Sequence, residues 1–224
     1  MAAMIETKQL TRTFSLDSGN SITVLKGIDI QIPDQSLTIL KGRSGSGKTT
    51  LLNILSALDL PSSGSVLFDG RDITKMTEEE REAARRLEMG YIFQAVALVP
   101  VMNVYENVEF SLRLAGYKKD RKARVEECLR RVGMLKRMNH MPSELSGGEQ
   151  QRVAIARALA HNPKVIFADE PTGALDTDNG LMVVSLFKEL IEKEGVTIIM
   201  TTHDPSLMQL GDVVFEMEDG EIHV

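Results

Sequence analysis

Residues Gly42 to Thr49 read Gly-Arg-Ser-Gly-Ser-Gly-Lys-Thr and stand between an apolar run, Ser36–Lys41, and a leucine-rich stretch with helical spacing, Lys48–Leu58. A glycine-rich loop of this spacing between a strand and a helix is typical of a phosphate-binding loop. Its glycines let backbone N–H groups wrap phosphates, and the helix N-terminus adds partial positive charge. The pattern arises by chance in roughly one chain in a hundred, so a plain glycine turn is the weaker interpretation. We predict that Lys48 reaches the β- and γ-phosphates of a nucleotide and that the Thr49 hydroxyl binds Mg²⁺.

A pair of carboxylates follows a second apolar run. Val165–Ala168 is continuously apolar, as a parallel strand covered on both faces should be, and Asp169 and Glu170 come directly after it. Alone, an acidic pair after a strand is usually a solvated turn. Because ligands of a parallel sheet bind at the carboxyl ends of its strands, we expect this pair beside the phosphate loop. Asp169 is suited to hold Mg²⁺ through its water shell, and Glu170 to orient and deprotonate an attacking water.

A second glycine-rich helix start lies at Leu145–Gln151, which reads Leu-Ser-Gly-Gly-Glu-Gln-Gln. One interpretation is purely structural, because Ser146 and Glu149 have the spacing of a capping box. A capped helix does not need a glycine pair, however, and an exposed glycine-rich helix N-terminus is a good anion site. Because a nucleotide in the same subunit does not need it, the segment suggests that two subunits close around ATP.

Strand and helix patterns alternate along the chain and predict an α/β fold with a parallel sheet. The expected strands are Ile5–Phe14, Ile22–Ile32, Ser36–Lys41, Ser65–Phe68, Met89–Phe93, Val165–Ala168, Val196–Thr201 and a C-terminal hairpin from Val213. The expected helices are Lys48–Leu58, Glu78–Glu88, Ser146–Ala160 and Thr177–Lys193. The early strands predict an N-terminal antiparallel subdomain. Strand patterns vanish between about Val101 and Met141, which predicts a helical insert.

Bulk properties limit the possible functions. The 224 residues carry a net charge of −6 without a long block of Lys and Arg, so a nucleic-acid groove is not favoured. Cys128 is the only cysteine, which fits a reducing cytosol and excludes an internal disulfide. The N-terminus lacks the features of a signal peptide, and no apolar run approaches the ~20 residues needed to span a bilayer. Any membrane role is therefore expected through a partner.

These motifs, in this order, resemble those of the ATP-binding cassette (ABC) ATPases. The similarity covers essentially the whole chain and includes Gln94 after an apolar strand, Gly173-Ala174-Leu175-Asp176 and His203. It implies a P-loop NTPase cassette, one domain over 4–224, with a core lobe (1–94 and 143–224) and a helical subdomain at about 95–142. It also implies a head-to-tail, ATP-dependent homodimer in which each ATP is bound by one subunit's phosphate loop and the other subunit's glycine-rich helix.

The resemblance assigns roles residue by residue. Gln94 matches the glutamine that touches Mg²⁺ and couples the site to a membrane subunit, and Asp176 matches an aspartate that crosses the dimer interface. His203 matches a histidine that contacts the γ-phosphate, and Phe14, where the family usually has Tyr, matches the aromatic that stacks on adenine. The predicted nucleotide-binding residues are Phe14, Gly42, Arg43, Ser44, Gly45, Ser46, Gly47, Lys48, Thr49, Thr50, Gln94, Ser146, Gly147, Gly148 and Asp176. The predicted metal ligands are Thr49, Gln94 and Asp169, and the predicted catalytic residues are Glu170, His203 and Lys48.

Further elements are similar to the branch of macrolide exporters, lipoprotein-releasing complexes and related bacterial peptide exporters. They include Ala57-Leu58-Asp59 and parts of Leu98–Val108, whereas Ala95-Val96-Ala97 and Asn103 depart from that branch. The implied function is an ATPase that drives a membrane permease from the cytoplasmic face of the membrane. The alternative is a regulatory ATPase that signals through a membrane partner to cell-wall or division machinery without transport. A DNA-repair or translation cassette is the weakest reading, because the chain has no long coiled-coil insertion and no second cassette.

Overall fold

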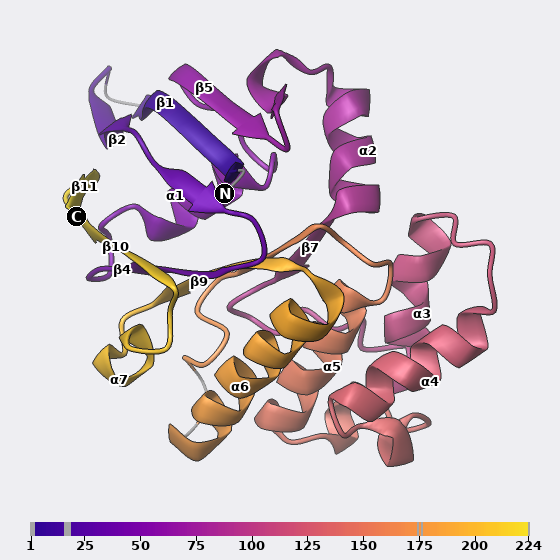
Figure 1. Ribbon diagram of the computed structural model, residues 1–224. Helices are drawn as coiled ribbons and strands as arrows, with labels where there is room; N and C mark the ends of the chain where they lie inside the picture. The colour runs from indigo at the N-terminus through magenta and orange to yellow at the C-terminus, as the bar shows by residue number, and fades with distance from the viewer. Residues whose placement is uncertain (1–2, 16–18, 174, 176, 224) are drawn as a thin grey trace.

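The computed structural model describes residues 3–15, 19–173, 175 and 177–223, and its elements are labelled in Figure 1. The strands are β1 Ala3–Ser15, β2 Ser21–Ile28, β3 Gln31–Pro33, β4 Leu37–Lys41, β5 Ser63–Phe68, β6 Arg71–Asp72, β7 Met89–Ile92, β8 Val165–Ala168, β9 Thr197–Thr202, β10 Val213–Glu218 and β11 Glu221–His223. The α-helices are α1 Lys48–Leu55, α2 Glu78–Glu88, α3 Val104–Leu114, α4 Arg121–Arg131, α5 Gly147–Leu159, α6 Thr177–Glu194 and α7 Pro205–Met208. Short 3-10 helices cover Ile73–Lys75, Leu135–Arg137 and Pro142–Glu144.

The strands form two sheets. The first is antiparallel, with the order β2-β1-β5-β6 and with β3 paired to β1. The second has the order β11-β10-β4-β9-β8-β7, and all of its pairs are parallel except the terminal hairpin of β10 and β11. The predicted fold class, an N-terminal antiparallel sheet with a largely parallel core and added helices, is confirmed.

The parallel sheet separates two apolar cores because its side chains alternate between faces. In β8, Val165 and Phe167 pack with α1 and the antiparallel sheet, whereas Ile166 and Ala168 pack with the helices of the other face. The antiparallel sheet and α1 lie on one side of the parallel sheet and α5 and α6 on the other (Figure 1). All four β8 residues are fully buried, which explains the continuous apolar run.

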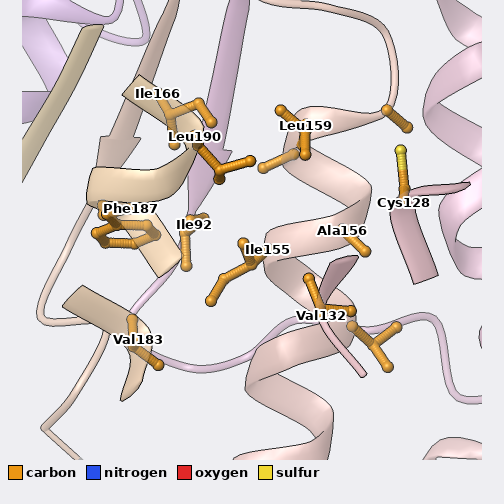
Figure 2. Packing of buried hydrophobic residues seen from close by; sticks show 14 of the residues in the cluster. Ile92, Cys128, Val132, Ile155, Ala156, Leu159, Ile166, Val183, Phe187 and Leu190 are labelled. Atoms are coloured by element: carbon orange, nitrogen blue, oxygen red, sulfur yellow. The ribbon is translucent and has the colours of Figure 1, made fainter. Parts of the chain in front are cut away.

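The predicted helical insert consists of α3 and α4, and it shares its core with α5. Cys128 of α4 and Val132, which directly follows this helix, belong to the same apolar cluster as Ile155 and Leu159 of α5 and Phe187 of α6 (Figure 2). Cys128 is fully buried, and burial raises the pKa of its thiol to about 11. A protonated thiol in an apolar cluster acts as a small apolar side chain.

Two predicted elements differ from the structure by more than two residues at an end, whereas the other shared elements agree to within two residues. The expected strand Ile22–Ile32 divides into β2 and β3, because Thr7 Oγ1 donates to the Ile28 carbonyl at 2.8 Å and accepts from the Ile30 N–H at 3.0 Å. The expected helix Lys48–Leu58 ends at Leu55, because Ala57 adopts a left-handed conformation with φ 58°. The predicted bounds of α2 and β8 match the structure, whereas β6 and α7 were not predicted.

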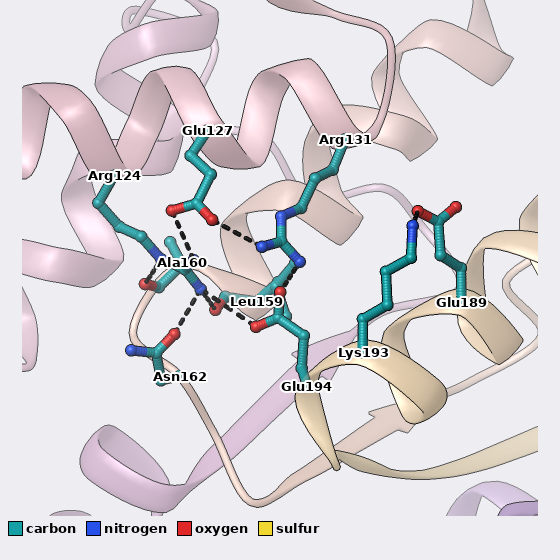
Figure 3. Close-up of polar contacts among 9 residues, drawn as sticks. All are labelled: Arg124, Glu127, Arg131, Leu159, Ala160, Asn162, Glu189, Lys193 and Glu194. Atoms are coloured by element: carbon teal, nitrogen blue, oxygen red, sulfur yellow. Dashed lines mark hydrogen bonds and ion pairs between the residues drawn. The ribbon is translucent and has the colours of Figure 1, made fainter.

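Arg124 of α4 holds the C-terminal end of α5. Its Nε donates to the Ala160 carbonyl at 2.9 Å, and its Nη2 donates to the Leu159 carbonyl at 3.2 Å and to Asn162 Oδ1 at 2.5 Å (Figure 3). The last carbonyls of a helix have no partner within the helix and carry partial negative charge. The Arg124 guanidinium, itself 7% exposed, therefore satisfies the end of α5 and fixes it against α4.

The same cation belongs to an ion-pair network that reaches α6. Glu127 Oε2 lies 3.0 Å from Arg124 Nη1, and Glu127 Oε1 lies 2.6 Å from Arg131 Nη2. Glu194, the last residue of α6, pairs with Arg131 and lies 3.8 Å from Arg124 Nη2 (Figure 3). The helical insert is thus joined to both helices on this face of the parallel sheet.

We expect Arg124→Met to lower the free energy of unfolding by about 3 kcal/mol, because it strips a buried network of its central cation. Urea denaturation followed by circular dichroism measures this loss. Arg130→Met removes an exposed charge from the same helix and is expected to change stability by less than about 0.5 kcal/mol. An equal effect of both substitutions would contradict the structural role of Arg124.

Candidate functional site

The phosphate-binding loop connects β4 to α1 and requires glycine at particular positions. A side chain at Gly42 would place its Cβ 2.3 Å from the Met217 carbonyl oxygen. Gly47, at the N-cap of α1, has φ 104°, and a Cβ there would lie 2.9 Å from Met217 Cε and 3.2 Å from the Val24 carbonyl. The neighbouring strands therefore press directly against the loop, and only glycine fits at these two positions.

Lys48 is buried inside this loop. Its Nζ donates to the carbonyls of Gly42 at 2.8 Å and Arg43 at 3.1 Å, and it lies 3.9 Å from Glu170 Oε1. The residue is 5% exposed. Because a buried ammonium needs acceptors, the loop holds the Lys48 cation at its centre, beside the carboxylate of Glu170, which follows β8.

The carboxylate of Asp169 joins three elements at the carboxyl edge of the parallel sheet. Its two oxygens accept from Thr49 Oγ1 of α1, at 3.1 and 3.0 Å. Thr201 Oγ1 of β9 donates to Asp169 Oδ1 at 2.8 Å. The Asp169 side chain is therefore fixed beside the phosphate loop, as the sequence predicted for an acid at the end of this strand.

The Glu170 carboxylate lies between the side chains of Lys48 and His203. Its Oε1 lies near Lys48 and its Oε2 lies 3.3 Å from His203 Nδ1. The backbone at Glu170 has φ 43°, an uncommon conformation for this residue type, and its N–H donates to Thr201 Oγ1 at 2.8 Å. The His203 side chain is 63% exposed. The strained backbone and the Thr201 hydrogen bond together set the direction of the Glu170 side chain.

These residues surround a polar cavity of about 310 Å³. The residues that line it are Val24, Ser44, Gly45, Gly47, Lys48, Thr49, Thr50, Gln94 and Glu170. Phosphate-loop N–H groups, the Thr49 hydroxyl, the Gln94 amide and the Glu170 carboxylate can therefore reach one ligand. Of the other predicted loop residues, Arg43 is exposed, and Ser46 is buried with its backbone carbonyl accepting from the Gly220 N–H at 3.2 Å.

Phe14 lies near the end of β1, opposite Ile22 of β2. Two residues along β2, Val24 lines the cavity. Phe14 is 38% exposed, so its ring has surface available to a ligand. An exposed aromatic ring close to a phosphate-binding cavity is suited to stack on a planar base.

The glycine-rich start of α5 does not line this cavity. Ser146 caps the helix: its Oγ accepts from the Glu149 N–H at 3.3 Å, and Glu149 Oε2 accepts from the Ser146 N–H at 2.9 Å. The Ser146 backbone hydrogen bond holds the pKa of Glu149 below its usual range. Gly147 is exposed and has open space around it. The predicted capping box is present, and the first residues of the helix, Ser146 and Gly147, are exposed.

Of the motif Gly173-Ala174-Leu175-Asp176, the residues Ala174 and Asp176 lie outside the described residues. The predicted role of Asp176 therefore stays a prediction. The predicted residues Lys48, Thr49, Gln94, Asp169, Glu170 and His203 come together, whereas Ser146, Gly147 and Gly148 lie elsewhere on the surface.

Sequence reasoning missed Thr201, which links Asp169 to the Glu170 backbone. A signal existed, because the expected strand Val196–Thr201 ends at this residue and parallel neighbours end at one edge of a sheet. The order of the strands in space was not known from the sequence, so the contact between β8 and β9 could not be placed. Val24 was missed for a similar reason, since it reaches the cavity from the antiparallel sheet.

Across residues 3–15, 19–173, 175 and 177–223, no group of three or more His, Cys, Asp or Glu side chains is arranged to bind a metal ion. Thr49 and Asp169 nevertheless supply hard oxygen donors next to the phosphate cavity. Mg²⁺ usually takes one or two protein oxygens and completes its shell with water and phosphate oxygens, so this donor set fits that ion. Among the described helices, none is long and apolar enough to cross a membrane.

Comparison with known proteins agrees with this geometry. The sequence profile of the family described as ABC transporter matches residues 25–173. The chain is 42% identical to the lipoprotein-releasing system ATP-binding protein LolD 2 of Rhodopirellula baltica, over 97% of this chain and 88% of that protein. It is 46% identical to the macrolide export ATP-binding/permease protein MacB of Wolinella succinogenes, over 98% of this chain but only 34% of that longer protein.

The fold is also similar to that of a solved relative. The dimeric post-hydrolysis structure of the ATP-binding cassette MJ0796 of Methanocaldococcus jannaschii, bound to ADP and Pi, superposes with a TM-score of 0.92 at 37% identity and covers 99% of this chain and 97% of that one. Because the profile spans the phosphate loop and the acidic pair, and the relatives match nearly the whole chain, this chain belongs to the ABC transporter family and is one of its ATP-hydrolysing cassettes.

Proposed function

We propose that two copies of this cassette close around two ATP molecules and thereby drive a membrane permease. One observation carries the proposal: Lys48, Thr49 and Glu170 line one cavity, whereas the glycine-rich start of α5 stays exposed outside it. A second anion-binding helix start that its own cavity does not use is suited to the γ-phosphate of a neighbour's nucleotide. The cassette MJ0796, which is dimeric with ADP and Pi, supports this arrangement.

In the proposed site, the phosphate loop from Gly42 to Thr50 wraps the nucleotide phosphates, and Lys48 leaves its loop carbonyls for the β- and γ-phosphates. Thr49, Asp169 and Gln94 would hold Mg²⁺, which would neutralise phosphate charge during the transfer. Thr201 keeps the Asp169 carboxylate directed at this position.

Glu170 acts on the attacking water. Its carboxylate accepts a proton as the water oxygen bonds to the γ-phosphorus and the bond to the ADP oxygen breaks. His203 now lies against Glu170 Oε2, and its exposed side chain is free to turn its other nitrogen to the γ-phosphate. Together they place a base and a hydrogen-bond donor on opposite sides of the transferred group.

We further propose that the permease contacts the surface between the core lobe and the helical subdomain at about 95–142. A hollow of about 370 Å³ lies there, lined in part by Leu58, Leu114 and Tyr91. Leu58 and Leu114 are 47% and 51% exposed, and exposed apolar side chains grouped in a hollow are typical of a protein interface. Tyr91 belongs to β7, and Gln94, which lines the nucleotide cavity, follows this strand. One short chain segment therefore links the hollow to the nucleotide cavity.

The names of the relatives support the substrate class. MacB is described as a macrolide export protein and LolD as part of a lipoprotein-releasing system. We propose that the permease of this cassette exports or extracts a hydrophobic compound, a peptide or a lipoprotein, and that the cassette works on the cytoplasmic face of the membrane.

Thr201→Val should lower kcat for ATP hydrolysis about 30-fold, because two hydrogen bonds of about 1 kcal/mol each are lost at Asp169 and Glu170. Steady-state phosphate release measures the change. Thr38→Val is the matched control, because Thr38 on the adjacent strand β4 is equally buried and its hydroxyl has no partner in the described structure. Equal kcat values for the two variants would show that Thr201 does not position the acidic pair.

Glu170→Gln should retain ATP binding, lose hydrolysis and accumulate as a dimer with ATP, because it lacks the base but keeps the site's shape. Adding Gly148→Asp should leave ATP binding intact and return the protein to monomers, since a carboxylate then opposes the neighbour's γ-phosphate. Light scattering after gel filtration measures the mass. Gly116→Asp adds the same charge at an exposed turn after α3 and should not affect the dimer. A dimer that persists with Gly148→Asp would show that the start of α5 is only a helix cap and does not contact the neighbour's nucleotide.

Leu58→Arg and Leu114→Arg should each abolish capture of the co-expressed permease on the tagged cassette while basal ATP hydrolysis stays within about twofold. A charge in the apolar hollow would have to be desolvated on docking, which opposes binding. Met182→Arg, at a 55% exposed position of α6, is the control and should not affect capture. If the permease binds both hollow variants as well as the control, it docks elsewhere.

A further inference from the structure

The guanidinium of Arg12 lies over the ring of Phe14, 4.4 Å from its centroid. The same guanidinium is anchored on its other side, because Arg12 Nη2 lies 2.9 Å from each carboxylate oxygen of Asp59. The Arg12 side chain is 22% exposed and the Phe14 residue 38%. One face of the ring is therefore covered by a fixed cation, and the ring still has free surface.

Asp59 connects this pair to the phosphate loop. It follows α1, and its N–H donates to the Asn53 carbonyl of that helix at 3.1 Å. The Leu60 N–H donates to Asp59 Oδ1 at 2.8 Å, which fixes the carboxylate on its own turn. Because α1 begins at the phosphate loop, the chain of contacts runs from Phe14 through Arg12 and Asp59 to the element that binds phosphate.

The end of β1 is held against the same turn by backbone groups. The Thr13 N–H donates to Ser62 Oγ at 2.9 Å, and the Ser62 N–H donates to the Thr11 carbonyl at 2.8 Å. The turn after α1 therefore fixes the backbone next to Phe14. What remains to be fixed is the orientation of the ring about its side-chain torsion angles. A side chain at an exposed strand end has several staggered rotamers, and a planar group stacked on one face restricts them.

We propose that Arg12 is a positioning residue for ATP: it holds the Phe14 ring so that the uncovered face stacks on adenine. The inference rests on the proposed role of Phe14 as the base-stacking aromatic. Arg12 suits the task because its planar guanidinium can stack on an aromatic face while it pairs with a carboxylate. A cation over the opposite face of the ring is also attracted by the negative potential of that face, and it does not contact the base.

The experiment compares binding of ATP with binding of inorganic tripolyphosphate, which has no base, by calorimetry on the full chain. Arg12→Gln should raise the Kd for ATP about threefold, and Phe14→Leu should raise it about tenfold. The double variant should bind ATP as Phe14→Leu does, because Arg12 has no ring left to position. Tripolyphosphate should bind all variants as it binds the unchanged chain. Asp59→Asn, which weakens the anchor, should resemble Arg12→Gln.

Lys8→Gln removes an exposed cation from the same strand and serves as the control for net charge. Equal weakening of ATP and tripolyphosphate by Arg12→Gln would overturn the proposal, because it would indicate a general effect on the fold. The proposal would also be overturned if the loss of ATP affinity in the double variant equalled the product of the losses in the two single variants, since the two residues would then act independently. Unchanged ATP affinity in Phe14→Leu would remove the base-stacking role and the inference with it. A normal loss in Phe14→Leu but none in Arg12→Gln would overturn the Arg12 assignment alone.

Discussion

The site depends on the hydrogen bonds that converge on the carboxylate of Asp169. This side chain is 5% exposed, and it accepts from Thr49 of α1 and Thr201 of β9. A buried carboxylate without hydrogen-bond donors would cost several kcal/mol, so these donors are a condition for its burial. The same bonds fix the relative positions of the phosphate loop, the acidic pair and the strand that ends before His203. The catalytic geometry is in this sense a consequence of how one buried charge is satisfied.

The remainder of the fold supplies the setting for this cluster. The parallel sheet brings the ends of β4, β8 and β9 to one edge, and an apolar core covers each of its two faces. The antiparallel sheet presses Val24 against the phosphate loop, and this contact explains why glycine is required at Gly47. On the opposite face, Arg124 binds the end of α5, so the helix that presents Ser146 and the following glycines is supported at its far end. The two proposed nucleotide-contacting surfaces therefore lie at different places on this frame and face different ligands.

Much of this could be predicted from local patterns. The continuous apolar run of β8 predicted both its burial and the place of Asp169 and Glu170, because only a doubly covered strand avoids polar residues. The capping box at Ser146 and the bounds of α2 were readable because helix starts have local chemical requirements. Errors arose where a long-range contact decides the local conformation. The strand expected over Ile22–Ile32 breaks because Thr7, far away in the sequence, binds the backbone at Ile28 and Ile30.

By itself, the sequence determined the chemical groups that the protein offers: a phosphate-binding loop, a carboxylate pair at a strand end and a second glycine-rich helix start. These depend on residue types at short spacings, which a linear pattern records. Only the tertiary structure decided which groups act on each other. Thr201 hydrogen-bonds to the acidic pair because β9 is the neighbour of β8. Asp59 anchors the Arg12 guanidinium over the Phe14 ring because the turn after α1 lies against β1. Strand order and sheet packing set those contacts, and both follow from the balance of burial over the whole chain.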